Sequence, residues 1–165
     1  MKKDAAATVY PDAKGKRFAI VSARFYADLA DWLEDGARRG LRDCGVSDGD
    51  VELVPVPGCF EIPLVARRLI VGGELDGVVA LGVVIRGDTP HFDYVAGECA
   101  RGIMSVQLAT GVPIGFGILT TENLAQAEER ADPKRLDKGH EAAIAAATVA
   151  IVEPAKHDKH RVGFR

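Results

Sequence analysis

The sequence predicts an α/β protein, a single-domain three-layer sandwich in which helices cover both faces of an open four-stranded parallel sheet. Strand-like and helical patterns alternate along the chain, which is typical of sheets built from strand–helix–strand units. Residues Val78–Ile85 are apolar on both faces, as expected for an interior strand of such a sheet. The length of 165 residues suits one domain with a real core.

Two strand–helix units occupy the first half of the chain. A short apolar strand is predicted at Arg17–Ser22, and helical spacing follows at Leu29, Leu33, Ala37, Leu41 and Cys44. Residues Val51–Val56 alternate as a strand does. Pro57 and Gly58 then break the pattern, and Glu61–Val71 is predicted to be a helix.

The second half continues the alternation. After the strand Val78–Ile85, apolar residues recur at helical spacing at Phe92, Val95, Cys99, Ile103 and Val106. Val112–Leu119 is predicted to be the fourth strand. Two helices are expected after it, around Glu122–Ala131 and Lys138–Val152, with Pro133 and Gly139 marking the join between them.

Composition restricts the class of partner. Apolar residues make up 47% of the chain and charged residues 27%, which is the balance of a folded protein. The formal net charge of −3 gives no global attraction to nucleic acid or to an anionic membrane surface. An anionic ligand must therefore be held by a local site.

We divide the chain into a flexible N-terminal segment 1–15, a domain 16–155 and a basic tail 156–165, which we expect to be solvated rather than a binding arm. The N-terminus lacks the apolar stretch of a signal peptide, and no apolar run is long enough to span a membrane. The cysteines are odd in number and form no C-x-x-C pair, which favours reduced thiols: Cys44, Cys59 and Cys99. These features indicate a cytoplasmic protein.

Three segments follow the first three strands, where open parallel sheets bind ligands: Arg24–Tyr26, Pro57–Glu61 and Arg86–His91. In the last of them, Thr89 suits a helix N-cap and Pro90 the first helical turn. The exposed N–H groups of such a helix start can bind a phosphate, and Gly87 would let it approach closely. The alternative is a capped helix without a ligand. Asp88 would repel an anion, so it has to contribute through its backbone with its side chain turned away.

Five side chains in or beyond these segments have two interpretations each. His91 could transfer protons at neutral pH or could serve packing alone. Phe60 and Glu61 offer an aromatic wall beside a hydrogen-bond acceptor, although a glutamate also favours a helix start. Phe25, at the exit of the first strand, and Phe116, in the fourth, could stack on a flat ring or fill the core.

Several common motifs do not fit. The sequence contains no G-x-x-x-x-G-K-[ST] run, which excludes the phosphate-binding loop of nucleotide hydrolases. Gly115 and Gly117 lie within a predicted strand and lack the third glycine of a dinucleotide fingerprint. His157 and His160 in the basic tail have no cysteine partners. We therefore expect no metal site.

Taken together, these segments resemble the 6,7-dimethyl-8-ribityllumazine synthase family, in unbroken order from about Arg17 to about Val152. The most specific stretches are Val56–Pro63, Leu81–Tyr94 and Phe116–Asn123. The resemblance implies a flavodoxin-like fold and a reaction of riboflavin biosynthesis without a cofactor. In that reaction, 5-amino-6-ribitylaminouracil and 3,4-dihydroxy-2-butanone 4-phosphate give the lumazine, phosphate and water.

The resemblance also implies roles for individual residues. Phe25 would stack on the uracil ring with Phe60 beside it, Glu61 would accept hydrogen bonds from the ribityl chain, and Val84 and Ile85 would offer main-chain contacts. The phosphate would be held by a second group, comprising Gly87, Asp88, Thr89 and Arg130. His91 would be the proton shuttle.

In this family the site lies between two subunits of a pentamer-based homo-oligomer, so the neighbouring subunit would supply Phe116, Glu129, Arg130 and Lys138. The resemblance also allows an association with riboflavin synthase. Two departures stand out: Tyr26 replaces a usual asparagine, and Lys134–Asp137 replaces a commoner glycine-containing loop that bears on assembly. The alternative function is a catalytically poor relative that stores or senses lumazine or flavin.

Overall fold

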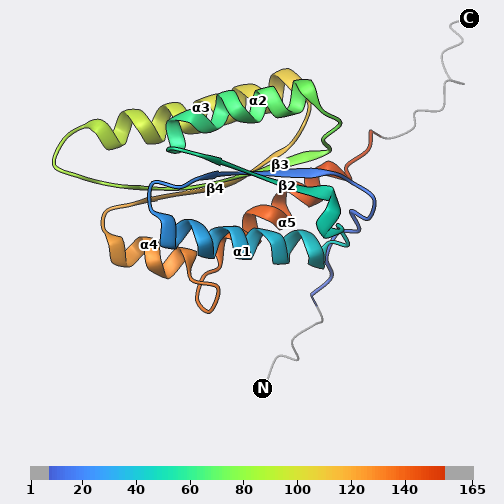
Figure 1. Ribbon diagram of the computed structural model, residues 1–165, viewed down its shortest axis with the longest axis horizontal. Helices are drawn as coiled ribbons and strands as arrows, with labels where there is room; N and C mark the ends of the chain where they lie inside the picture. Colours follow the sequence, from blue (N-terminus) through green and yellow to red (C-terminus); the bar gives the residue numbers. More distant parts are fainter. Residues whose placement is uncertain (1–7, 155–165) are drawn as a thin grey trace, which may run out of the picture.

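The computed structural model describes residues 8–154, and its four strands form one parallel sheet in the order β2-β1-β3-β4 (Figure 1). The strands are β1 (Phe18–Ala23), β2 (Val51–Val56), β3 (Gly77–Ile85) and β4 (Ile114–Thr121). Because β1 and β3 are neighbours, the chain reverses its direction of travel across the sheet between them. Ligand sites of open parallel sheets lie at the carboxyl ends of the strands at such a switch point.

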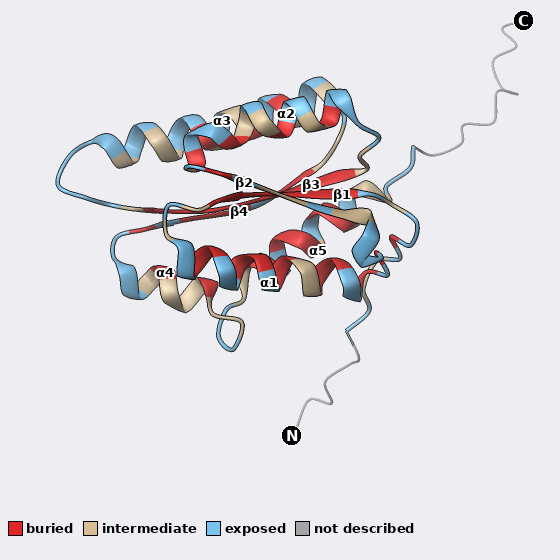
Figure 2. Ribbon diagram, in the orientation of Figure 1, coloured by how far each residue is buried: buried red, intermediate tan, exposed pale blue. Residues whose placement is uncertain are grey.

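Helices cover both faces of this sheet, as expected. One face carries α2 (Ile62–Gly72) and α3 (His91–Thr110). The other face carries α1 (Ala27–Asp43), α4 (Leu124–Ala131) and α5 (Lys138–Ala150). Two buried clusters, one on each side of the sheet, make up the core, and Figure 2 shows the strands between them as the most buried layer. The predicted three-layer α/β sandwich is therefore confirmed.

The fourth strand begins two residues later than the sequence pattern predicts. Pro113 has no N–H to give to a neighbouring strand, although its carbonyl accepts a hydrogen bond from Val78 N at 2.9 Å. Ladder pairing starts at Ile114, opposite Val78, and continues to Thr121, opposite Ile85. The polar end of the strand was missed because its side chains do not continue the apolar pattern.

Two helix starts also differ from the sequence prediction. A short 3-10 turn, η2 (Cys59–Glu61), precedes α2, so the α-helix begins at Ile62. Helix α4 begins at Leu124 because the Asn123 side chain accepts a hydrogen bond from Gln126 N at 2.9 Å and serves as the N-cap.

Helix α5 is held closely against β4 and α1. A side chain at Gly115 would place its Cβ 2.1 Å from the carbonyl oxygen of Ala142, so only glycine permits this approach. Asp137, directly before α5, adopts a left-handed conformation with φ of 48°. Arg39 of α1 donates to both of its carboxylate oxygens, at 2.9 and 3.1 Å. This pair fixes the backbone next to Lys138.

The N-terminal residues that the structure describes contact the same layer. Ala13 is buried and donates its N–H to the Cys44 carbonyl at 2.8 Å, and Tyr10 makes an edge contact with the ring of His140. Residues 1–7 and the tail from residue 155, including His157 and His160, lie outside the described range. Within residues 8–154, no helix is both long and apolar enough to cross a membrane.

Candidate functional site

A pocket of about 480 Å³ lies at the carboxyl ends of the strands, near the switch point between β1 and β3. We call it the strand-end pocket. It brings together six residues that the sequence singled out: Phe25, Phe60, Glu61, Val84, Ile85 and His91. They lie at or just after the ends of three different strands, so the parallel topology explains why residues so far apart in sequence meet here.

Two aromatic side chains in this pocket are exposed rather than part of the core. Phe25 is 74% exposed and Phe60 is 59% exposed. The Phe25 ring is supported by an edge contact with Tyr26, whose ring centroid lies 5.0 Å away. Tyr26 in turn packs against the core cluster beneath the sheet. Both phenylalanines are therefore available to a flat ligand ring.

The turn before α2 supplies both the polar and the apolar parts of the pocket wall. Glu61 is exposed at the end of η2, with its carboxylate open to the pocket. Cys59 is buried beside it. Hydrogen bonding with Cys99 and, to a smaller extent, burial raise the pKa of the Cys59 thiol well above its ordinary value. This thiol therefore stays protonated and is a poor nucleophile at neutral pH.

The exposed segment Gly87–Thr89 leads from β3 into α3 at the rim of the pocket. The sequence predicted Thr89 as the N-cap and Pro90 in the first turn of the helix. In the structure Pro90 occupies the N-cap position, so α3 starts one residue later, at His91. The Thr89 hydroxyl nevertheless accepts a long hydrogen bond from His91 N, at 3.4 Å. The N–H groups and dipole of α3 thus face a glycine-containing loop, an arrangement suited to an anion.

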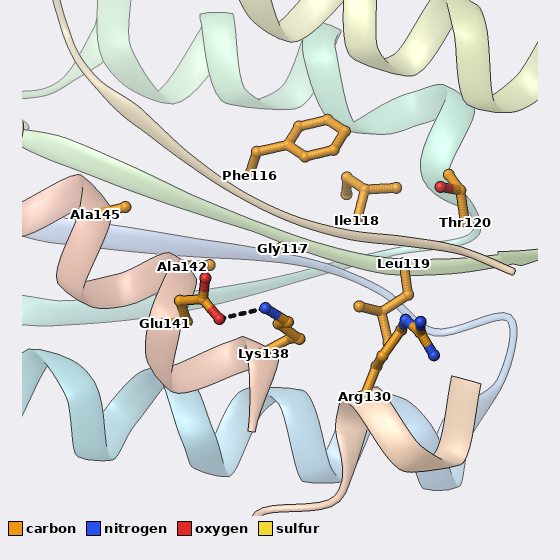
Figure 3. A pocket seen from close by; sticks show the side chains of 10 residues that line it. All are labelled: Phe116, Gly117, Ile118, Leu119, Thr120, Arg130, Lys138, Glu141, Ala142 and Ala145. Carbon is orange, nitrogen blue, oxygen red and sulfur yellow. Dashed lines mark hydrogen bonds and ion pairs between the residues drawn. The ribbon is translucent and has the colours of Figure 1, made fainter. Parts of the chain in front are cut away.

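A second pocket, of about 360 Å³, lies along the outer edge strand of the sheet. We call it the β4-edge pocket. Phe116, Arg130 and Lys138 are among its lining residues. Figure 3 shows Arg130 and Lys138 reaching toward β4 from α4 and α5, whereas Phe116 projects from the other side of the strand. Phe116 is 49% exposed and does not fill the core.

Both cations of the β4-edge pocket have carboxylate partners within the chain. Arg130 Nη1 lies 3.6 Å from Glu129 Oε2, and Lys138 pairs with Glu141. All four side chains are partly exposed, and ion pairs of this kind contribute little to stability. An incoming phosphate could therefore compete for either cation through charge-assisted hydrogen bonds.

The two pockets have no lining residue in common. The predicted site residues therefore fall into three groups. The group around His91 lines the strand-end pocket, and Phe116, Arg130 and Lys138 line the β4-edge pocket. The segment Gly87–Thr89, between β3 and His91, lines neither pocket.

Sequence reasoning missed several lining residues. In the strand-end pocket, these are Gly58, Cys59, Val83, Tyr94 and Val95. Tyr94 could have been found, because it lies three residues after His91 and hence on the same face of α3. In the β4-edge pocket, Glu141 follows Lys138 at the same spacing. The contribution of Cys59 depends on burial, which no local pattern reveals.

The fold defines a class: a flavodoxin-like α/β protein, here with one pocket at the carboxyl ends of its strands and another along β4. The chain also matches the family described as 6,7-dimethyl-8-ribityllumazine synthase over residues 15–153. Proteins of that name from Desulfotalea psychrophila and Nitratidesulfovibrio vulgaris are each 49% identical to it. The first comparison covers 84% of this chain and 89% of the relative, and the second covers 86% and 92%. The chain belongs to the 6,7-dimethyl-8-ribityllumazine synthase family.

Proposed function

We propose that this protein condenses 5-amino-6-ribitylaminouracil with 3,4-dihydroxy-2-butanone 4-phosphate to form 6,7-dimethyl-8-ribityllumazine, phosphate and water. Membership of the family supports the reaction. One observation supports the site assignment: the matching residues around His91 and those around Arg130 line two pockets that share no lining residue. In this proposal a complete site combines the strand-end pocket of one subunit, the adjoining segment Gly87–Thr89 and the β4-edge pocket of the neighbouring subunit.

The aminouracil is assigned to the strand-end pocket. Phe25, exposed and braced by Tyr26, stacks on the uracil ring, and Phe60 forms a second aromatic wall. Glu61 accepts hydrogen bonds from the ribityl hydroxyls. The main chain of Val84 and Ile85, at the end of β3, orients the ring edge. From the neighbour, Phe116 and Lys138 close the pocket.

The phosphate is assigned to the start of α3. Gly87, Asp88 and Thr89 present backbone N–H groups there, backed by the helix dipole. The neighbour's Arg130 supplies the positive charge that Asp88 makes necessary, because the Asp88 carboxylate would otherwise repel the ligand. In the single chain Arg130 pairs with the Glu129 carboxylate. In the assembled site the phosphate, which carries more negative charge, replaces Glu129 as the partner of Arg130.

The chemistry requires little from the protein beyond orientation and proton transfer. The 5-amino group attacks the ketone and forms an imine with loss of water, and phosphate leaves by elimination. The ribitylamino nitrogen then closes the ring with loss of a second water. The substrate brings its own nucleophile, which agrees with the protonated state of Cys59. His91, on the rim between the two substrate positions, carries the protons.

We propose a pentamer-based ring, the assembly that the family resemblance implies, because it would bring the two pockets of adjacent subunits together. β4 is an edge strand of the sheet, and the pocket beside it is open on the single chain. Large apolar side chains are also exposed on the outer layer formed by α2 and α3, as expected of a protein–protein contact: Leu64, Val71, Tyr94, Met104 and Leu108. We place the assembly in the cytoplasm, in agreement with three free, buried cysteines.

Mixing both substrates with the purified protein, without added metal or nucleotide, tests the reaction. We expect lumazine absorbance to appear together with one phosphate released for each lumazine formed. Saturable lumazine binding without any turnover would instead favour a storage or sensing role.

A further inference from the structure

Arg86 is the last residue before the segment that we assign to the phosphate, and the proposed chemistry does not use it. Its Nε donates to Glu122 Oε2 at 2.9 Å, and its Nη1 donates to Asp93 Oδ1 at 3.3 Å. Its guanidinium carbon also lies 4.3 Å from the centroid of the Phe92 ring. One side chain thus makes three directed contacts in an exposed part of the molecule.

These partners come from two different places in the chain. Phe92 and Asp93 belong to the first turn of α3, next to His91, whereas Glu122 follows the end of β4. The backbone adds a link in the same place, because Arg86 N donates to the Thr121 carbonyl at 2.9 Å. Arg86 therefore ties the helix start to the end of the neighbouring strand, with Gly87–Thr89 held between them.

We propose that Arg86 is a positioning residue that fixes the phosphate segment Gly87–Thr89 and the His91 backbone in the geometry that the reaction needs. The inference rests on the proposed function of this segment. Residues 86–91 are all exposed. The hydrogen bond from His91 N to the Thr89 hydroxyl is long, at 3.4 Å, and therefore holds the loop only weakly. Backbone N–H groups can bind a phosphate tightly only if the loop is already fixed, and a misplacement of about 1 Å is costly.

A direct contact between Arg86 and the phosphate is the competing role, and the geometry argues against it. Two of the guanidinium N–H groups already point at carboxylates. Glu122 and Asp93 would also repel an anion that approached the remaining N–H groups. The two roles therefore predict opposite effects when one of these carboxylates is removed.

Steady-state kinetics of three variants test the proposal. For Arg86→Gln we expect the KM of the phosphate substrate to rise about tenfold, while the KM of the aminouracil stays within about twofold. Arg86→Lys should recover only part of the loss, because an ammonium group lacks the planar fork that spans both carboxylates. Glu122→Ala should raise the KM of the phosphate substrate if Arg86 positions the loop, and should lower it if Arg86 contacts the phosphate.

Arg42→Gln is the matched control. Arg42 is also an exposed arginine paired with a carboxylate, Asp48, at 3.2 Å, and it lines neither pocket. We expect both KM values to be unchanged in this variant. Thermal melting of all variants separates a local loss of geometry from unfolding.

Failure of this inference is distinguishable from failure of the proposed site. If His91→Ala and Arg130→Ala both retain full activity, the site assignment itself is wrong. If those two variants are impaired but Arg86→Gln leaves the KM of the phosphate substrate unchanged, or raises both KM values equally, the positioning role is overturned. A lowered KM in Glu122→Ala would overturn it as well.

Discussion

The two histidines that the structure describes within helices have different surroundings. His91 is exposed on the rim of the strand-end pocket. His140, on the opposite layer, lies 2.7 Å from the Asp43 carboxylate and against the Tyr10 ring. An imidazole can transfer protons to a ligand only where the ligand reaches it, so the proposed shuttle is His91.

For His91→Ala we expect turnover to fall about 10²-fold, the low end for losing a general acid–base group, because the substrate supplies its own nucleophile. Aminouracil binding should be nearly unchanged, since the aromatic walls remain. Initial rates and equilibrium binding measure the two effects. An unchanged rate would remove His91 from the mechanism.

Arg130→Ala should act mainly on the phosphate substrate, because a charge-assisted anchor is lost while the strand-end pocket stays intact. The expected change is a rise in the KM of that substrate of about tenfold or more. An equal loss of affinity for the aminouracil would refute the assignment. Substrate titrations at a fixed, saturating concentration of the second substrate separate the two.

Individual site residues were predictable wherever they belong to a contiguous motif. The stretches around Glu61 and His91 carry the resemblance, and the structure gathers both in one pocket. The Arg86 network was not predictable, because Glu122 lies 36 positions away and its approach depends on β3 and β4 being neighbours. The sequence also could not show whether Phe25 and Phe116 are exposed, because aromatic residues in strands and just after them occur both in cores and in binding sites.

Among the secondary-structure elements, alternating patterns predicted the four strands and the five α-helices of the described residues but not the short 3-10 turns, and most differences lie at the ends. β4 begins after Pro113, which has no N–H for the ladder, and α4 begins after Asn123, whose side chain accepts the N-cap hydrogen bond. Hydrophobic spacing shows neither effect. The strand order was not readable from the sequence. After β2, helix α2 leads the chain back past β1, so that β3 pairs with the other edge of β1. Packing between residues distant in sequence determines this choice.

The turn before α5 gives a test at this scale. Asp137 has a φ of 48°, where glycine is the usual residue, and its carboxylate pairs with Arg39. Both Asp137→Ala and Asp137→Gly remove the ion pair, but only alanine keeps the left-handed strain. We therefore expect the alanine variant to be about 1 kcal/mol less stable than the glycine variant. Thermal melting of the two variants measures the difference, and equal melting temperatures would contradict a strained turn.

For the whole molecule, the proposed assembly would cover the open pocket at the edge strand and the exposed apolar layer. Five chains of 17.6 kDa give about 88 kDa. Light scattering should therefore detect particles of that mass or multiples of it, because in a closed ring every β4-edge pocket meets the strand-end pocket of a neighbouring subunit. A stable, active monomer would contradict the shared site.

The division of the site between subunits is the central claim, and mixing two impaired variants tests it most directly. His91→Ala and Arg130→Ala chains are refolded together in equal amounts, and mass measurement confirms that mixed rings form. Each site takes its histidine from one subunit and its arginine from the next. About a quarter of the sites in a randomly mixed ring should then regain both residues.

With the phosphate substrate well below its KM, where both parents are slow, activity should accordingly rise well above that of either parent, toward about a quarter of the unmodified protein. If His91 and Arg130 instead served the same site from one chain, no mixed ring could contain a complete site. The mixture would then show only the average of the two parent activities, and that result would contradict the account.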